Sequence, residues 1–146
     1  MEIIKLEVIQ TTYNQQNFLK IGCTYNQESV KYAIESGIDL SFMFTKNDNP
    51  FNLACKYQPE ACKYLLESKY VNSKMIMESV NGRTSIDDAY DMQPKALYYI
   101  LQSKHFVNDM LNLEDDRGYK LMYRIKNVFP EVTDVKSISK VNVIEH

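Results

Sequence analysis

One segment of the chain occurs twice, and this internal repeat limits the possible folds more than any other feature. Residues 58–69 return as residues 93–104, with Gln, Pro, Ala, Tyr, Leu, Ser and Lys in register 35 residues later. Met75 recurs as Met110 at the same offset. A fixed period of this size indicates a repeat array, in which each unit buries its apolar face against its neighbours. Because such an array offers a long surface, the repeat favours a binding activity.

Composition sets the class of protein. The 146 residues are 45% hydrophobic and 25% charged, which predicts one ordinary globular domain spanning residues 1–146. The net charge of -2 provides no basic excess for phosphate backbones, so we expect no nucleic-acid partner. No apolar run reaches membrane-spanning length and the N-terminal residues lack the apolar core of a signal peptide, so we expect no membrane association. The odd number of cysteines, without metal-ligand spacing, favours a reducing cytoplasmic compartment.

The repeat predicts paired helices. Pro59 and Pro94 each begin a helix with apolar residues at helical spacing, and we expect a shorter helix before each of them. Residues 47–50 and 81–84 have the composition of turns. The same frame extends upstream through residues 28–37 and downstream to a further pair, whose second helix begins at Pro130. The sequence therefore predicts an all-α solenoid of about four helix pairs. The predicted units cover approximately residues 14–46, 47–81, 82–116 and 117–140.

Short motifs within these units resemble ankyrin repeats. Residues 49–55 resemble the ankyrin signature Thr-Pro-Leu-His-x-Ala-Ala, residues 84–89 are a poorer copy, and residues 36–39 resemble the Gly-Ala-Asp that ends an ankyrin unit. The resemblance covers roughly residues 13–132 and, in style, is similar to the divergent ankyrin proteins of large DNA viruses of amoebae. It implies short helices on a concave side, longer helices outside, and perpendicular hairpin-like turns between pairs. Equal helices joined by tight loops would instead favour a tetratricopeptide array.

The chain departs from the ankyrin pattern in two ways. The motif His is replaced in all four units, and Thr84 is the one retained motif Thr, so the Thr–His hydrogen bond is missing. Residues 71–78 and 107–113 are insertions in which we expect short extra helices. Ser73 and Asn108 are the predicted N-caps of these helices.

No pattern of catalytic residues is evident. Neither of the two histidines lies in a nucleophile motif, and the four glycines form no phosphate loop, so we expect no enzyme activity, cofactor or metal. The acidic cluster of Asp87, Asp88 and Asp91 is interpreted as a solvated helix face, with Asp87 accepting a bond from Thr84. Two columns of equivalent residues are interpreted as packing residues. Cys23 and Cys55 are small core residues, and the other column packs between outer helices: Tyr32, Tyr64 and Tyr99.

The resemblance assigns partner binding to the turn tips and the ends of the short first helices. We expect a non-catalytic protein–protein interaction module that binds an elongated peptide or a protein edge, directed at host proteins if the chain is viral. A small enzyme and a nucleic-acid-binding helical repeat are the alternatives, and the inserted segments with Met75 and Met110 are an alternative binding surface. The predicted binding residues on the concave face are Tyr25, Asp48, Lys56, Tyr57, Arg83, Asp91, Met92, Lys126 and Asn127.

Overall fold

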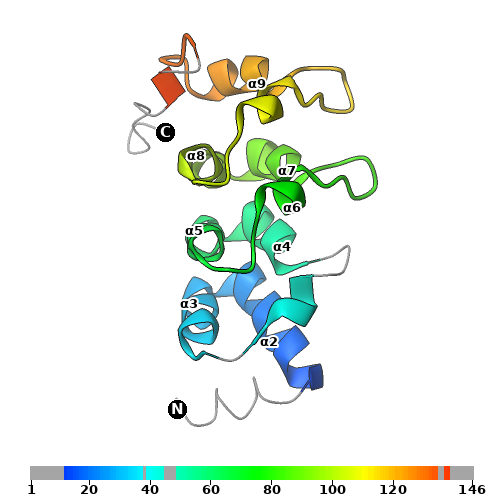
Figure 1. Cartoon of the computed structure of the whole chain (residues 1–146), viewed down its shortest axis with the longest axis vertical. Coiled ribbons are helices and arrows are strands. Elements are labelled where there is room, and N and C mark those ends of the chain that lie inside the picture. Colours follow the sequence, from blue (N-terminus) through cyan, green and yellow to red (C-terminus); the bar gives the residue numbers. More distant parts are fainter. Residues whose placement is uncertain (1–11, 38, 45–48, 135–136, 139–146) are drawn as a thin grey trace.

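The chain is all-α in the computed structural model, which describes residues 12–37, 39–44, 49–134 and 137–138 (Figure 1). Within these residues there are eight α-helices and two short 3-10 helices, and no strand. Isolated β-bridges connect Val80 with Arg83 and Glu114 with Lys120. The predicted helical class is therefore confirmed.

Six of the helices form three consecutive pairs, and one residue links the two helices of each pair. Asn26, Gln58 and Gln93 are the linking residues, and their φ values of -149°, -136° and -142° break the helix at equivalent places. Pro59 and Pro94 follow two of these links and begin the second helices, as predicted. The pairs are α2 (Thr12–Tyr25) with α3 (Gln27–Glu35), α4 (Pro50–Tyr57) with α5 (Pro59–Glu67), and α7 (Ser85–Met92) with α8 (Pro94–Gln102).

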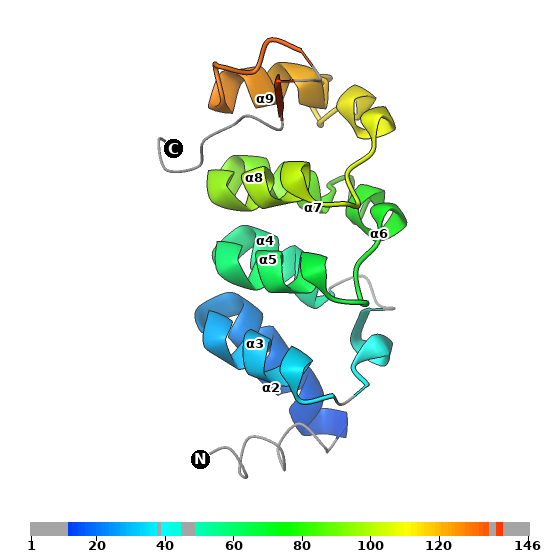
Figure 2. The same cartoon turned by 60° about the vertical axis from the view of Figure 1, so that its left-hand side comes forward.

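The pairs lie one above another along the chain. The first helices α2, α4 and α7 pack in that order, and the second helices α3, α5 and α8 pack in the same order beside them. Figures 1 and 2 show the two columns from views that differ by 60°, with α9 (Leu121–Val128) at the end of the stack. Equivalent residues of consecutive pairs are therefore brought to the same side of the molecule.

The fourth helix pair is incomplete, so the prediction of a second helix from Pro130 is wrong. Phe129 ends α9 with φ -122° and ψ 81°, close to the conformation of Gln58 and Gln93, but residues 130–134 form turns and coil. Thr133, Asp134 and Ser137 follow, and their short polar side chains compete with a helix for backbone hydrogen bonds. Ser137 shows this competition, because its hydroxyl accepts bonds from the backbone of Thr133 and Asp134 at 2.9 and 3.2 Å.

In two pairs the helices are almost equal in length, and in the first pair the first helix is the longer one, which contradicts the predicted short first and longer second helix. The helices α4 and α7 have 8 residues each, α5 and α8 have 9 each, and α2 with 14 residues is longer than its partner α3. The second helices end early because Ser68 and Ser103 adopt extended conformations. Each hydroxyl then accepts a bond from the amide two residues on, at 3.2 Å from Tyr70 and 3.1 Å from His105. This local bond competes with another helical turn.

A hairpin-like turn connects the second pair to the third. Val80 and Arg83 exchange backbone hydrogen bonds of 2.7 and 3.1 Å. The two central residues, Asn81 and Gly82, have φ values of 55° and 80°, which is the arrangement of a type I′ turn. Asn and Gly tolerate these angles, so the local sequence explains the turn.

A second hairpin-like turn precedes α9. Glu114 bridges to Lys120, and between them the carboxylate of Asp115 accepts 2.9 Å bonds from the amides of Arg117 and Tyr119. Both turns project to the same side of the stack in Figure 1.

The inserted segments form short helices, as predicted, but their caps differ from the prediction. The segments contain α6 (Ser73–Met77) and the 3-10 helix Asn108–Asn112. Asn72 caps α6 by accepting a bond from the Met75 amide at 2.9 Å, whereas the Ser73 hydroxyl donates to the carbonyl of His105 at 2.5 Å. The residue before the 3-10 helix is Val107, which has no side-chain cap, so Asn108 is not a cap either.

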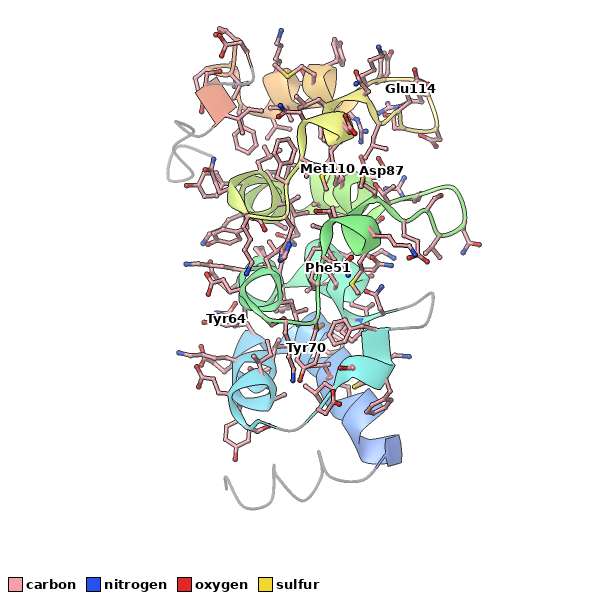
Figure 3. All side chains as sticks on the ribbon, in the orientation of Figure 1. Phe51, Tyr64, Tyr70, Asp87, Met110 and Glu114 are labelled. Carbon is pink, nitrogen blue, oxygen red and sulfur yellow. The ribbon has the colours of Figure 1, made fainter. Side chains whose placement is uncertain are left out.

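The core runs between the two columns of helices. Leu66 and Leu101 are 4% and 5% exposed, in agreement with a core position. Figure 3 shows Phe51 and Met110 along this interior, and both are fully buried. The three cysteines are buried free thiols, and burial raises the pKa values of Cys23 and Cys55 well above their usual range. The prediction that Cys23 and Cys55 are core residues is confirmed.

Two of the outer tyrosines pack between neighbouring second helices. Lys31 lies over the ring of Tyr64 at 5.8 Å and Lys63 lies over the ring of Tyr99 at 5.6 Å, so the same cation–π contact recurs one unit later. Figure 3 shows Tyr64 on this outer side. The hydroxyl of Tyr99 donates to Glu60 at 2.6 Å instead of pointing only to water. The packing interpretation is confirmed for these two residues.

Glu60 gives this outer column a pH dependence. Partial burial raises its pKa, but hydrogen bonds from Lys95 at 2.7 Å and from Tyr99 outweigh this effect and lower the pKa below its usual value. A lowered folded-state pKa stabilises the fold above the unfolded-state pKa of about 4.3 and loses that contribution as the pH falls through the folded value. We expect wild type to be more stable than Glu60→Gln at pH 7 by less than about 1 kcal/mol. Urea unfolding at pH 7 and pH 3 should show this advantage disappear; a constant difference would contradict the assignment.

Candidate partner-binding surface

The last residue of each first helix carries a large apolar side chain that solvent reaches. Tyr25, Tyr57 and Met92 end α2, α4 and α7, and are 78%, 42% and 48% exposed. Each directly precedes a linking residue of the same conformation, so equivalent backbone positions present all three side chains. Since the first helices pack in order, the three side chains recur along one side of the stack.

Sequence reasoning missed three further exposed apolar residues, one on α2, one on α9 and one in the turn before α9. Ile21 is 57% exposed one helical turn before Tyr25, and Tyr123 is 58% exposed on α9. Tyr119 is 46% exposed and stacks on Tyr123 with ring centroids 5.2 Å apart. The spacing of four residues before Tyr25 could have identified Ile21. These residues, with the previous three, are called the apolar row: Ile21, Tyr25, Tyr57, Met92, Tyr119 and Tyr123.

Two of the predicted charged residues are partners of each other. Arg83, at the first hairpin turn, donates to Asp91 at 2.5 Å and to Asp88 at 3.1 Å, and both carboxylates lie on α7. The hydrogen bond with Asp91 and the weaker one with Asp88 outweigh partial burial and raise the pKa of Arg83. These contacts hold the hairpin turn against the third pair, so Arg83 and Asp91 have a structural role in addition to any contact with a partner.

The acidic cluster of α7 is mostly buried, so its interpretation as a solvated helix face is wrong. Asp87 and Asp88 are 5% and 8% exposed. Arg124, which is 1% exposed, reaches back from α9 and donates to Asp87 at 2.6 Å. It also donates to the carbonyl of Leu113 at 3.1 Å. The sequence did not indicate this pair, because its two residues lie 37 positions apart on different helices.

Asp87 has a second role at the start of α7. The Thr84 amide donates to its carboxylate at 2.8 Å, while the Thr84 hydroxyl accepts from the Asp87 amide at 3.2 Å. This reciprocal arrangement is a capping box. The prediction that Asp87 accepts a bond from Thr84 is confirmed, and the two bonds tie the acidic side chain to the helix N-terminus.

Two cavities follow one another between the first helices and the hairpin turns. The first, called the α4 pocket, has a volume of about 250 Å³. Its lining is Asn49, Asn52, Leu53, Lys56, Val80, Asn81, Arg83 and Asp88. The second, called the α7 pocket, has a volume of about 320 Å³. Its lining is Arg83, Asp87, Asp91, Asp115, Asp116, Arg117 and Arg124. Arg83 belongs to both and forms the wall between them.

The remaining predicted residues lie in different surroundings. Lys56 is half-buried and lines the α4 pocket. Lys126 and Asn127 are exposed on α9, where the Asn127 amide donates to the hydroxyl of Tyr90 on α7 at 3.1 Å. Asp48 lies outside the described residues. The alternative binding surface on the inserted segments would need both methionines exposed. Met110 is fully buried and Met75 is half-buried, so these segments offer little apolar surface.

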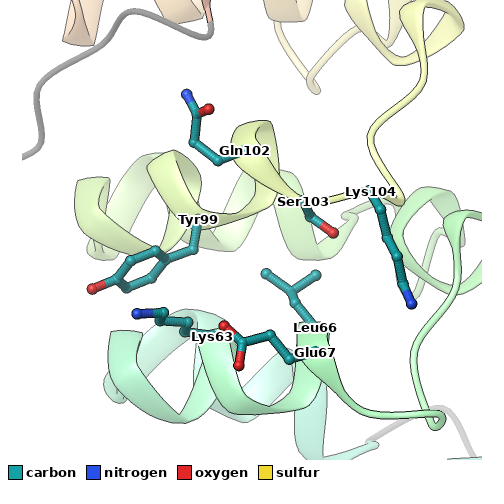
Figure 4. Close-up of a pocket in the computed structure, with 7 residues that line it drawn as sticks. All are labelled: Lys63, Leu66, Glu67, Tyr99, Gln102, Ser103 and Lys104. Atoms are coloured by element: carbon teal, nitrogen blue, oxygen red, sulfur yellow. The ribbon is translucent and has the colours of Figure 1, made fainter.

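The opposite side of the stack carries repeated hollows as well. A groove of about 340 Å³ lies between α5 and α8 (Figure 4), and a second of about 220 Å³ lies between α3 and α5. Lys63, Glu67 and Tyr99 in the first groove are equivalent to Lys31, Glu35 and Tyr64 in the second. We call the first of these the outer groove.

Over the part of the chain that the structure describes, no cluster of three or more His, Cys, Asp or Glu side chains is arranged to hold a metal ion. No helix in that part has the length and apolar character needed to cross a membrane. Comparison with known proteins finds no match: no family model fits the sequence, and no curated protein or solved structure is significantly similar to it.

Proposed function

We propose that the chain is a divergent ankyrin-like repeat solenoid that acts as a non-catalytic protein-interaction module. The partner is a protein segment that lies along the first-helix side of the stack, which corresponds to the concave face of an ankyrin array. The observation that carries this proposal is the apolar row, in which Tyr25, Tyr57 and Met92 present 42–78% of their surface at equivalent places in consecutive pairs. Tyrosine and methionine are enriched at the centres of protein interfaces.

The ankyrin assignment is supported by the connections between pairs. Hairpin-like turns at residues 80–83 and 114–120 are the feature expected of ankyrin units, whereas the nearly equal helix lengths are not. The repeated conformation at Asn26, Gln58, Gln93 and Phe129 supports a repeat that continues into α9. The resemblance in style to the ankyrin proteins of amoeba viruses makes host proteins the proposed targets.

The charged groups favour a protein partner over the two alternatives. A nucleic-acid binder would need an excess of basic groups, but the net charge is -2, and Arg83 and Arg124 are paired with carboxylates of α7. An enzyme would require ionisable groups that are free to act on a substrate. The buried carboxylates Asp87 and Asp88 are instead paired with Arg124 and Arg83. A reducing compartment such as the cytoplasm fits the three buried free thiols.

Truncation of the central tyrosine tests the proposal. Affinity capture from the native host, followed by mass spectrometry, would identify the partner. We expect Tyr57→Ala to weaken binding of that partner by about 1–2 kcal/mol or more, because a large interface side chain is lost. The melting temperature should change little, because the tyrosine is 42% exposed. Calorimetric titration of the purified pair would measure the affinity, and a melting curve of each variant would measure any change in stability.

The matched control lies on the opposite side of the stack. Lys63→Ala removes an exposed side chain from α5 and should leave the affinity unchanged. Wild-type affinity in both Tyr57→Ala and the Arg83→Ala, Met92→Ala double variant would contradict binding along the first-helix side. That result would direct attention to the inserted segments.

A further inference from the structure

The α4 and α7 pockets have opposite charge, and this contrast suggests what a partner must carry. In the α4 pocket, Arg83 is paired with Asp88, and Lys56 forms no ion pair with the described residues. The ammonium group of Lys56 therefore gives the lining of the α4 pocket one unpaired positive charge. Because the other polar side chains there belong to asparagines, the α4 pocket favours a carboxylate.

The α7 pocket has the reverse balance. Arg124 is paired with Asp87, and Arg117 lies 3.5 Å from Asp115. Arg83 is shared between Asp91 and a carboxylate of the neighbouring α4 pocket. Asp116 is exposed and has no ion-pair partner among the described residues. The lining therefore holds more carboxylate than cation, and it favours an ammonium or guanidinium group.

The two pockets are one unit apart. Packed helices lie about 8–10 Å apart, and an extended chain advances about 3.3 Å per residue, so the two pockets are spaced by about three residues of an extended peptide. Arg83 separates them and is fixed by its two carboxylate partners, which keeps the order of charges constant.

We propose that the α4 and α7 pockets together recognise an extended protein segment that carries an acidic side chain and, about three residues away, a basic side chain. The acidic group lies beside Lys56 and the basic group beside Asp116. This inference depends on the proposed function, and it adds charge specificity and a fixed direction to a surface whose apolar contacts come from the apolar row. Complementary charge of this kind determines specificity and register more than total affinity.

Peptide selection with the full chain tests the inference. The probe is a phage library of random linear 12-residue peptides, selected separately against wild type and against a Lys56→Glu, Asp116→Lys double variant. We expect wild type to enrich peptides with one order of acidic and basic residues at this spacing, and the variant to enrich the opposite order. A synthetic peptide selected on wild type should bind the double variant about tenfold or more weakly, because like charges then meet in both pockets.

The control reverses charge in the outer groove. Lys63→Glu, Glu67→Lys changes an equal number of charges in a hollow of similar size (Figure 4) and should preserve the wild-type peptide order. Circular dichroism and melting curves of each variant establish that it is folded.

The outcomes separate this inference from the proposed function. Selected peptides that lose affinity with Tyr57→Ala but keep it after charge reversal would overturn the charge preference and leave the proposed function standing. A selection without binders, or with binders insensitive to both changes, would overturn both. Reversal of the selected order by the double variant alone would support the inference.

Discussion

Arg124→Met will destabilise the chain by about 3–5 kcal/mol, because it leaves the carboxylate of Asp87 buried beside an apolar side chain. The pair is well enclosed: Arg124 is 1% exposed, Asp87 is 5% exposed, and their atoms are 2.6 Å apart. The pair also joins α9 to α7 across a boundary where the stack has no complete fourth helix pair. Chemical unfolding in urea, followed by circular dichroism, measures the loss.

Two further variants separate the buried charge from the helix cap. Thr84→Ala removes the hydroxyl of the capping box and should cost about 1 kcal/mol. The Asp87→Leu, Arg124→Met double variant removes both charges and should recover most of the stability, apart from the cap. A loss below about 1 kcal/mol for Arg124→Met alone would show that the pair does not hold the end of the stack.

Leu66→Ala and Leu101→Ala will each cost about 2–5 kcal/mol, since truncation of a buried leucine loses apolar contacts and leaves a cavity. The two residues occupy equivalent positions in α5 and α8 and are 4% and 5% exposed. Thermal or urea unfolding should remain a single transition, because so short a stack of helix pairs has few interfaces to lose independently.

The exposed neighbour Lys63 provides the control for this pair of variants. Lys63→Ala lies on the same helix as Leu66 and removes only a cation–π contact with Tyr99, so it should change the free energy of unfolding by less than about 1 kcal/mol. Losses below about 1 kcal/mol for both leucine variants would show that the face of the second helices that carries Leu66 and Leu101 is not the core face.

Most of the helical framework could be predicted from local sequence rules. The prolines at positions 59 and 94 begin helices, Asn81-Gly82 forms a turn, and the leucines at helical spacing are buried, because each of these outcomes depends on nearby residues. Helix ends were harder to predict. Serine hydroxyls at the ends of the second helices compete with the helix for backbone hydrogen bonds, and so do the polar side chains after Pro130. The spacing of apolar residues gives no information about this competition.

The candidate surface was predictable only in its exposed residues. Tyr25, Tyr57 and Met92 are the last residues of α2, α4 and α7. Their exposure could be predicted because they occupy the same position in the repeated sequence pattern. The contacts of Arg83 with Asp91 and of Arg124 with Asp87 join residues 8 and 37 positions apart. These pairs depend on how a hairpin turn and the last helix approach α7, which the sequence pattern does not specify.

Site-specific photo-crosslinking would show which side of the stack contacts the partner. A benzophenone amino acid placed singly at Tyr57 or Met92, and at Lys63 or Lys95 as outer-side controls, would be irradiated in extract of the native host. We expect positions 57 and 92 to crosslink to the same protein and positions 63 and 95 not to crosslink to it. If a host protein crosslinks from positions 63 and 95 and none crosslinks from positions 57 and 92, binding along the first-helix side is contradicted.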